Sequence, residues 1–122
     1  MNKGKVIEET ALKCATIAVS PGPGGSTMLT GNYEGSAPGL GKTVVTASFA
    51  GRHSGTFIAH GYSFGEDGET VSGTATGQYE KTGTNHWRTN GILERSTGET
   101  PIIEGEMDLA TRTWTVRHCE KA

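Results

Sequence analysis

The sequence predicts an all-β fold, namely a closed antiparallel barrel of eight strands. The 122 residues include 19 Gly and 18 Thr but only 4 Pro, and 33% are hydrophobic, a composition typical of turn-rich β proteins. Segments of strand length recur about every ten to fifteen residues and are separated by turn sequences. A short motif also occurs twice. A chain of this length forms about one domain, so we expect a single domain over 1–122.

The repeated motif is Thr-Gly-x-Tyr-Glu, present as Thr30–Glu34 and Thr76–Glu80. A looser pattern, Thr-x-Ile-x-x-Gly, follows each copy, at Thr56–Gly61 and Thr100–Gly105. Both repeats predict an internal pseudo-twofold arrangement. The expected half-repeats are approximately 27–70 and 71–119.

The N-terminal segment from Val6 to Ser20 is ambiguous. Glu8–Ala15 is compatible with two turns of helix, whereas Cys14–Val19 is continuous, partly β-branched and bounded by a breaker, as in a buried strand. We expect a strand that ends at Ser20. The next segment, Pro21–Ser26, is rich in Pro and Gly and predicts an exposed loop rather than a phosphate-binding loop, because no helical pattern follows it.

Three strands complete the predicted first half. Thr27–Glu34 is short and is followed by a turn at Gly35–Gly41. Thr43–Ala50 alternates apolar and polar residues as a half-buried strand does, with Phe49 on the more apolar face. The turn at Gly51–Gly55 leads into the next strand.

That next strand, Thr56–Phe64, carries the residues on which the functional expectation depends. Ile58, His60, Tyr62 and Phe64 share one face. Burying the apolar members of this set would bring both polar groups into the barrel. The opposite orientation, with Phe57 inside, is the alternative.

The second half begins after Gly65–Glu69, a hairpin turn that contains Asp-Gly. Its expected strands are Thr70–Tyr79, His86–Arg95, Thr100–Leu109 and Arg112–Cys119. The first of these places small residues and Tyr79 on one side, which we take as the inner side. Eight strands can close into a barrel without exposed edges, with an interior that is either filled or able to hold one small ligand.

The first copy of the motif extends to Thr30-Gly31-Asn32-Tyr33-Glu34-Gly35-Ser36. This stretch resembles the Thr-Gly-x-Phe-x-Gly-Ala hairpin of allene-oxide-cyclase-like barrels, the group that includes dirigent proteins. The second copy departs from that pattern at Lys81 and Thr82. The resemblance implies an eight-stranded barrel, usually oligomeric, that encloses a hydrophobic small molecule and steers cyclisation or coupling. It supplies no catalytic motif.

We expect a ligand in the barrel lumen to contact mainly apolar and aromatic side chains. The candidates are Phe49, Ile58, His60, Tyr62, Phe64, Tyr79, Trp87 and Trp114. His60 and Tyr62 are candidates for acid, base or orienting roles, and Arg112 is a candidate charged anchor at the barrel mouth. The alternative for each is structural: a filled core for the aromatic residues, and a surface ion pair for Arg112.

Other kinds of site have weaker support. Glu104, Glu106 and Asp108 alternate along one strand, either as a glycosidase-like acid pair or as a solvated outer face, and we favour the outer face. The four His residues lack metal-ligand spacing, so we expect no metal and no cofactor. Cys14 and Cys119 would stay reduced in a cytoplasmic protein, although a disulfide is the alternative if they are neighbours.

Charge and hydropathy limit the partners. The net charge is −2, acids and bases are interspersed, and no basic run is interleaved with aromatic residues, so we expect neither nucleic acid nor a membrane surface as partner. The N-terminus resembles no signal peptide, which predicts a cytoplasmic location. Two functions are therefore expected: binding of a small apolar molecule, with cyclase- or isomerase-like activity as an extension, or a filled barrel acting as a structural or homo-oligomeric interaction module.

Overall fold

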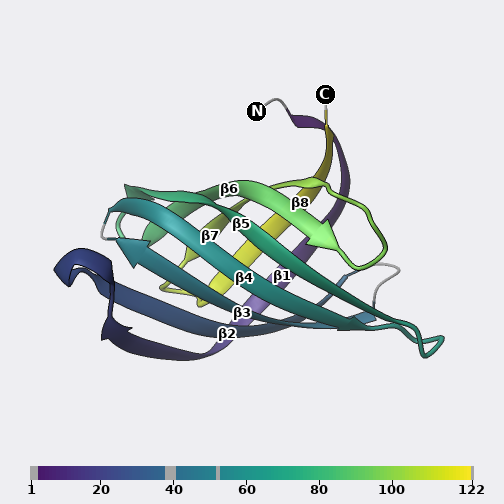
Figure 1. Cartoon of the computed structure of the whole chain (residues 1–122), viewed down its shortest axis with the longest axis horizontal. Coiled ribbons are helices and arrows are strands. Elements are labelled where there is room, and N and C mark those ends of the chain that lie inside the picture. The colour runs from purple at the N-terminus through teal and green to yellow at the C-terminus, as the bar shows by residue number, and fades with distance from the viewer. Residues whose placement is uncertain (1–2, 38–40, 52, 122) are drawn as a thin grey trace.

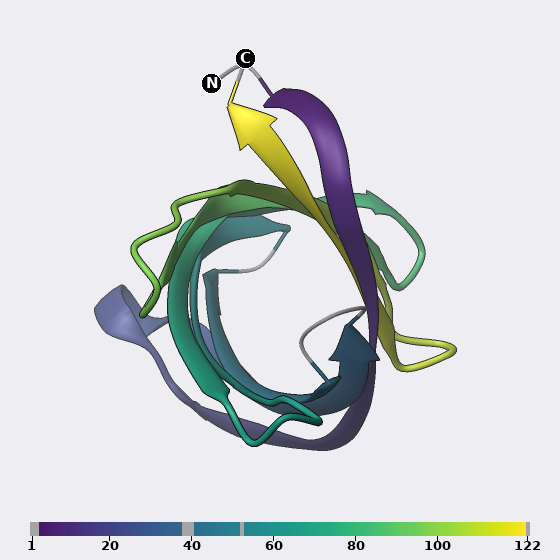
Figure 2. The same ribbon diagram turned by 90° about the vertical axis from the view of Figure 1, so that its right-hand side faces the viewer.

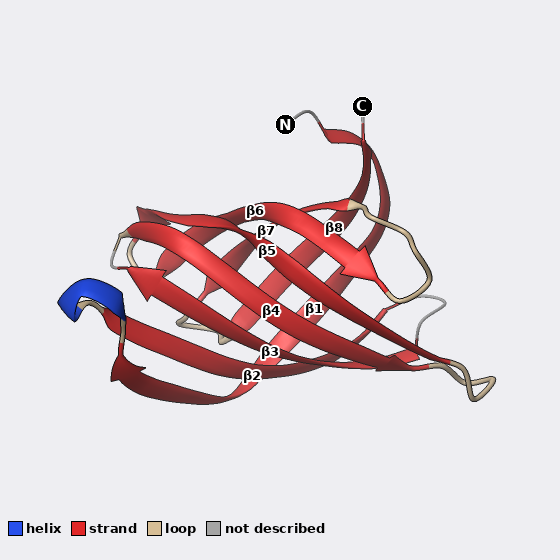
Figure 3. Cartoon of the chain, in the orientation of Figure 1, coloured by secondary structure: helices blue, strands red, loops and turns tan. Residues whose placement is uncertain are grey.

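A computed structural model describes residues 3–37, 41–51 and 53–121 of the chain. Within these ranges the chain forms eight strands and one 3-10 turn, η1 (Pro23–Gly25) (Figures 1 and 3). The strands are β1 (Lys3–Pro21), β2 (Thr27–Ala37), β3 (Gly41–Gly51), β4 (Ser54–Phe64), β5 (Thr70–Gly83), β6 (His86–Arg95), β7 (Ile102–Asp108) and β8 (Thr113–Lys121).

The sheet is a closed barrel, as the sequence predicts. Each strand pairs antiparallel with the next along the chain, and β8 returns to pair with β1. Viewed along the barrel in Figure 2, the ribbon makes a ring, and the two ends of the chain lie side by side where β1 and β8 extend beyond it. Closure provides each strand with two hydrogen-bonded neighbours, which removes the exposed edges of an open sheet.

The ambiguous N-terminal segment is a strand. Residues 11–21 of β1 pair with β2, and residues 3–13 pair with β8. The register shifts between Cys14 and Thr16, and again around Val6 and Glu8. Such irregularities bend a strand and raise its twist, which helps one long strand to contact both neighbours of a closed barrel.

Both copies of the repeated motif lie within strands rather than in turns. Thr30–Glu34 occupies the middle of β2, which continues to Ala37 through part of the predicted turn, and Thr76–Glu80 occupies β5. Tyr33 and Tyr79 are both buried. The two-fold internal repeat itself stays a prediction.

One half of the barrel interior is filled by aromatic side chains, which we call the aromatic plug. Its members are Tyr33, Phe49, Phe57, Tyr79 and Trp114. Phe49 contacts Phe57, Tyr79 and Trp114 with ring centroids 5.4–5.7 Å apart, and the Phe57 and Trp114 centroids are 5.8 Å apart. The pairs are mostly edge-to-face, a geometry that adds to the stabilisation from burial alone. The Trp114 indole donates a hydrogen bond of 3.1 Å to the Thr89 hydroxyl.

Two backbones come into close contact where a glycine of one strand faces a glycine of the next. Gly77 of β5 is paired directly with Gly91 of β6. A Cβ on Gly91 would overlap the carbonyl oxygen of Thr76 and crowd the Cα of Gly77. Glycine is therefore required here by the close contact of two backbones.

The predicted orientation of β4 is wrong. Phe57, Ala59 and Ser63 are buried, whereas Ile58 is 43% exposed and Phe64 is 50% exposed. The register explains this, because Phe57 is paired with Phe49 on β3, and directly opposed residues project from the same face of a sheet. Since Phe49 points inward, Phe57 must do so too.

Candidate functional site

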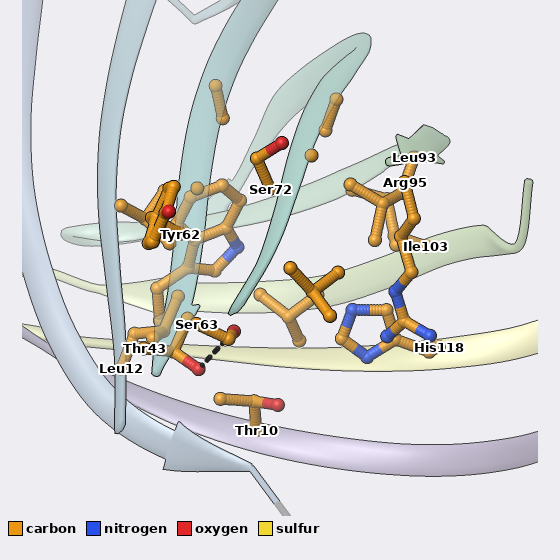
Figure 4. A pocket seen from close by; sticks show the side chains of 18 residues that line it. Thr10, Leu12, Thr43, Tyr62, Ser63, Ser72, Leu93, Arg95, Ile103 and His118 are labelled. Atoms are coloured by element: carbon orange, nitrogen blue, oxygen red, sulfur yellow. Dashed lines mark hydrogen bonds between the residues drawn. The ribbon is translucent and has the colours of Figure 1, made fainter. Parts of the chain in front are cut away.

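The half of the barrel beyond the aromatic plug holds a cavity. It lies at the end where the Gly65–Glu69 turn joins β4 to β5, and its free volume is about 90 Å³. Because a water needs about 10–15 Å³ of such space, the cavity has room for about six to nine water-sized groups. The wall is mainly apolar, with Leu12, Val45, Ala59, Val71, Ala75, Leu93, Ile103, Trp114 and Val116 among the lining residues (Figure 4).

Two polar atoms beside this cavity have no hydrogen-bond partner among the described residues. They are the Thr10 hydroxyl oxygen and Nδ1 of His118. Thr10 is only 4% exposed, so solvent has little access to the hydroxyl. By contrast, the hydroxyls of Thr43 and Ser63 on the opposite wall satisfy each other at 2.9 Å. Buried polar groups are nearly always paired, so the two unpaired atoms need an explanation.

A mostly buried ion pair lies next to them. Arg95, the last residue of β6, donates a hydrogen bond to Glu8 of β1. The two side chains are 11% and 14% exposed, and the His118 side chain is 12% exposed. Nδ1 of His118 is 3.7 Å from the nearer Glu8 oxygen. Figure 4 shows Arg95 and His118 together at one side of the cavity.

The barrel register accounts for this cluster. Glu8 is paired directly with His118 across β1 and β8. The strand β6 ends at Arg95, whose backbone N–H binds the Glu99 carbonyl in the following loop. A second guanidinium nitrogen of Arg95 is 3.7 Å from the exposed Glu99 carboxylate.

The imidazole of His118 is expected to be mainly uncharged at neutral pH, because its pKa is lowered. Burial lowers the pKa of its imidazole below 6.5, the nearby Glu8 carboxylate opposes that shift, and the Arg95 guanidinium adds to it. A neutral imidazole donates from one ring nitrogen and accepts at the other. The residues that line the cavity thus include a neutral histidine, a threonine and an arginine that is already paired.

Four of the predicted lumen residues do lie in the interior. Phe49, Tyr79 and Trp114 are buried, and Trp87 is partly buried against the same core. Only Trp114 among them also lines the cavity. The other three fill the opposite half of the barrel, in agreement with the filled-core alternative.

The remaining candidates are on or near the outer surface. Ile58, His60 and Phe64 point outward because of the β4 register, and the His60 ring is hydrogen-bonded to Thr74 on the outside. Tyr62 is also largely exposed, although it contributes to the cavity mouth. Arg112 is exposed in the turn before β8, with a positive φ of 58°. It does not line this cavity, and its role as a charged anchor stays a prediction.

Sequence analysis missed the polar residues that the structure brings together. Thr10, Arg95 and His118 all line the cavity. The alternation of apolar and polar residues could have identified two of them as inward-facing, since Arg95 shares its face with Leu93, and His118 shares its face with Val116. No such pattern identified Glu8 and Thr10, because the sequence of that segment is compatible with both a helix and a strand.

Other polar clusters are explained without a ligand. Glu104 and Glu106 lie on the outer side of β7, where Arg117 binds them at 2.9 and 2.7 Å, as the outer-face interpretation expects. Cys14 and Cys119 are free and buried. Cys119 is paired with Val6, about 25 Å along β1 from Cys14 at the usual rise per residue, so the two sulfurs do not meet.

Within residues 3–37, 41–51 and 53–121, no group of three or more His, Cys, Asp or Glu is arranged to hold a metal ion. None of the helical segments in these ranges has the length and apolarity of a membrane span. No protein-family model, curated protein or solved structure matches the chain. The resemblance to allene-oxide-cyclase-like barrels therefore stays a prediction.

Proposed function

We propose that the protein binds a small, largely apolar molecule in the cavity. The observation that carries this proposal is a lumen that is filled at one end and hollow at the other, with Thr10, Arg95 and His118 in its otherwise mainly apolar wall. Ligand sites in proteins typically combine an apolar wall with a few polar groups that fix orientation. The cyclase or isomerase activity that the resemblance implies remains an extension of this proposal.

The cavity has space to enclose a ligand, or the part of one, of about six to nine non-hydrogen atoms, at one water-sized group per atom. Very small ligands gain at most about 1.5 kcal/mol per atom, and most gain much less. We therefore expect dissociation constants in the micromolar to millimolar range for simple probes. A probe at ten times its dissociation constant stabilises the folded state by about 1.4 kcal/mol, enough to detect in a thermal-shift assay.

The test compares the native protein with a variant whose cavity is blocked. Gly61 lines the cavity, and a Cβ added there meets only Val45 and Val44 at ordinary contact distances. Gly61→Leu should therefore fold and fill the cavity. A matched control, Thr76→Leu, adds a similar side chain on the exposed face of β5.

We expect uncharged ring compounds of five or six carbons to raise the melting temperature of the native protein and of Thr76→Leu, and to leave Gly61→Leu unchanged. Trp114 lines the cavity, so its fluorescence should change over the same concentration range. An equal thermal shift in the blocked variant would refute lumenal binding.

A second candidate function is self-assembly, which the outer surface of β3 and β4 favours. Val44, Ile58, Tyr62 and Phe64 are all exposed there, and the Tyr62 and Phe64 rings are 4.9 Å apart. Adjacent exposed apolar groups are typical of interaction surfaces. Sedimentation of the native protein and of Phe64→Ser tests this function: a dimer that the substitution dissociates supports it, and a native monomer at high concentration refutes it.

A further inference from the structure

Barrel closure leaves one stretch of strand edge without a partner among the described residues. The pairing of β1 with β8 ends at Lys13, and the next backbone N–H, that of Cys14, binds the Arg112 carbonyl in the turn before β8. From Ala15 to Pro21, β1 pairs with β2 alone, and every residue of this segment is exposed. We call it the free edge. It belongs to the β1–β2 hairpin, which carries η1 at its tip in Figure 3.

The hydrogen-bond pattern shows which backbone groups the free edge offers. The Gly22 N–H binds the Ser26 carbonyl and so continues the β1–β2 ladder, whose register is regular from Thr16 onward. In an antiparallel pair, alternate residues direct both N–H and C=O to the partner strand, and the residues between them direct both groups away. Counting back from Gly22, Ile17 and Val19 direct their backbone groups to the free edge.

The side chains of the free edge are suited to pairing with a copy of itself. Natural sheet edges usually carry charged residues that prevent pairing with another chain, but the sequence Ala-Thr-Ile-Ala-Val-Ser-Pro of the free edge has none. Ile17 is 45% exposed and Val19 is 69% exposed. Val19 is paired with Leu29 of β2, which is also exposed, so three apolar side chains share one uncovered face.

We infer that the free edge pairs with the same edge of a second copy of this chain, antiparallel and about a two-fold axis at Ala18. In this register Ile17 of one copy is opposite Val19 of the other, and each such pair exchanges two backbone hydrogen bonds. On the other face, Thr16 is opposite Ser20. Apolar groups meet apolar groups and hydroxyls meet hydroxyls, so the edge is self-complementary, as a two-fold interface requires.

Pro21 disfavours one neighbouring register. It alternates in step with Val19, so its backbone nitrogen also faces the free edge, where proline has no N–H to donate. A two-fold axis at Val19 would place Pro21 opposite Ile17 and lose the hydrogen bond from that position. An axis at Ile17 would instead use Ala15, which lies at the register shift of β1. With the axis at Ala18, the central hydrogen bonds involve neither Ala15 nor Pro21.

A cysteine at the axis tests both the pairing and its register. Ala18 would face its own copy in a non-hydrogen-bonded pair, with Cα atoms about 4.5 Å apart, which a disulfide can span. Mild oxidation should therefore convert Ala18→Cys to a cross-linked dimer. Ser20→Cys is the matched control on the same face, because its two copies would be about 14 Å apart and should stay uncross-linked. The native cysteines are buried, so the native protein should not cross-link either.

Sedimentation of charged variants tests the interface without a cross-link. Val19→Lys introduces the residue with which natural sheets most often block edge pairing, so the dimer expected of the native protein should be lost. Ile7→Lys adds the same charge at a 58% exposed position of β1 outside the free edge and should leave the dimer intact. Val19→Pro removes an N–H that the β1–β2 ladder does not use, so it should fold, as circular dichroism can verify, and be monomeric.

The outcomes separate this interface from the other proposals. A native monomer at every concentration would overturn the inference, even if an unrelated extended peptide bound to the free edge. Equal cross-linking of Ala18→Cys and Ser20→Cys would overturn it too. A dimer that Phe64→Ser dissociates and Val19→Lys leaves intact would overturn it in favour of the outer surface of β3 and β4. Lumenal binding depends on other residues, so its failure would leave the interface unaffected.

Discussion

Replacing Thr10 by Val should stabilise the ligand-free protein, contrary to the usual effect of a substitution in a barrel interior. The Thr10 hydroxyl is buried and has no partner among the described residues. Burying a hydroxyl without a hydrogen bond costs about 1–3 kcal/mol in proteins, and valine occupies nearly the same volume. We expect a gain of about 1–2 kcal/mol, which corresponds to about 4–8 °C in melting temperature for a domain of this size.

Thr89→Val is the matched control. Thr89 is 1% exposed, but its hydroxyl accepts the hydrogen bond from the Trp114 indole. The same substitution there leaves a buried N–H unpaired and should cost about 1–3 kcal/mol. The midpoint of urea unfolding should thus rise in Thr10→Val and fall in Thr89→Val. If Thr10→Val lowers stability as Thr89→Val does, the Thr10 hydroxyl is hydrogen-bonded in the folded protein, which would contradict this reasoning.

Three further predictions concern the surrounding structure. Arg95→Ala leaves its mostly buried carboxylate partner unpaired and should cost about 3 kcal/mol, whereas Arg88→Ala breaks an exposed pair and should leave the urea midpoint unchanged; equal effects would contradict the burial of the first pair. Gly91→Ala should cost about 3 kcal/mol or prevent folding because of backbone overlap, whereas at Gly83 the nearest atom to an added Cβ is 3.7 Å away, so Gly83→Ala should show native circular dichroism and melting. Burial lowers the pKa of His118 below the 6.5 of the unfolded chain, so stability is full above pH 6.5 and falls as the pH drops toward the folded value; between pH 7.5 and 5.5 the native protein should lose more stability than His118→Gln, and an equal loss would contradict a buried neutral imidazole.

The barrel was predictable because the sequence patterns that indicate strands and turns are local and recur along the chain. Alternation along β3 and β5 identified their inner faces correctly, with Phe49 and Tyr79 buried. The orientation of β4 was missed because its outward face, with Ile58 and Phe64, is the more apolar one. Pairing decides that orientation: a hairpin that places Phe57 opposite Phe49 turns the more apolar face outward.

The polar cluster could not be predicted from the sequence, for a different reason. Glu8 and His118 are far apart along the chain and meet only because β8 closes the barrel against β1. Register shifts around Val6 and Glu8 decide which residues of β1 face inward at this end. No periodic pattern encodes a bulge of this kind, so the Glu8–Arg95–His118 cluster required the structure.

The central claim is that the hollow end of the barrel receives a small, largely apolar ligand. Its most direct test is a two-dimensional NMR titration of the isotope-labelled protein with an uncharged ring compound of five or six carbons. The account predicts saturable shifts at Thr10, Val116 and His118, on the inner surface of the cavity. Shifts confined to the exposed rings of Tyr62 and Phe64, with the cavity residues unchanged, would contradict it.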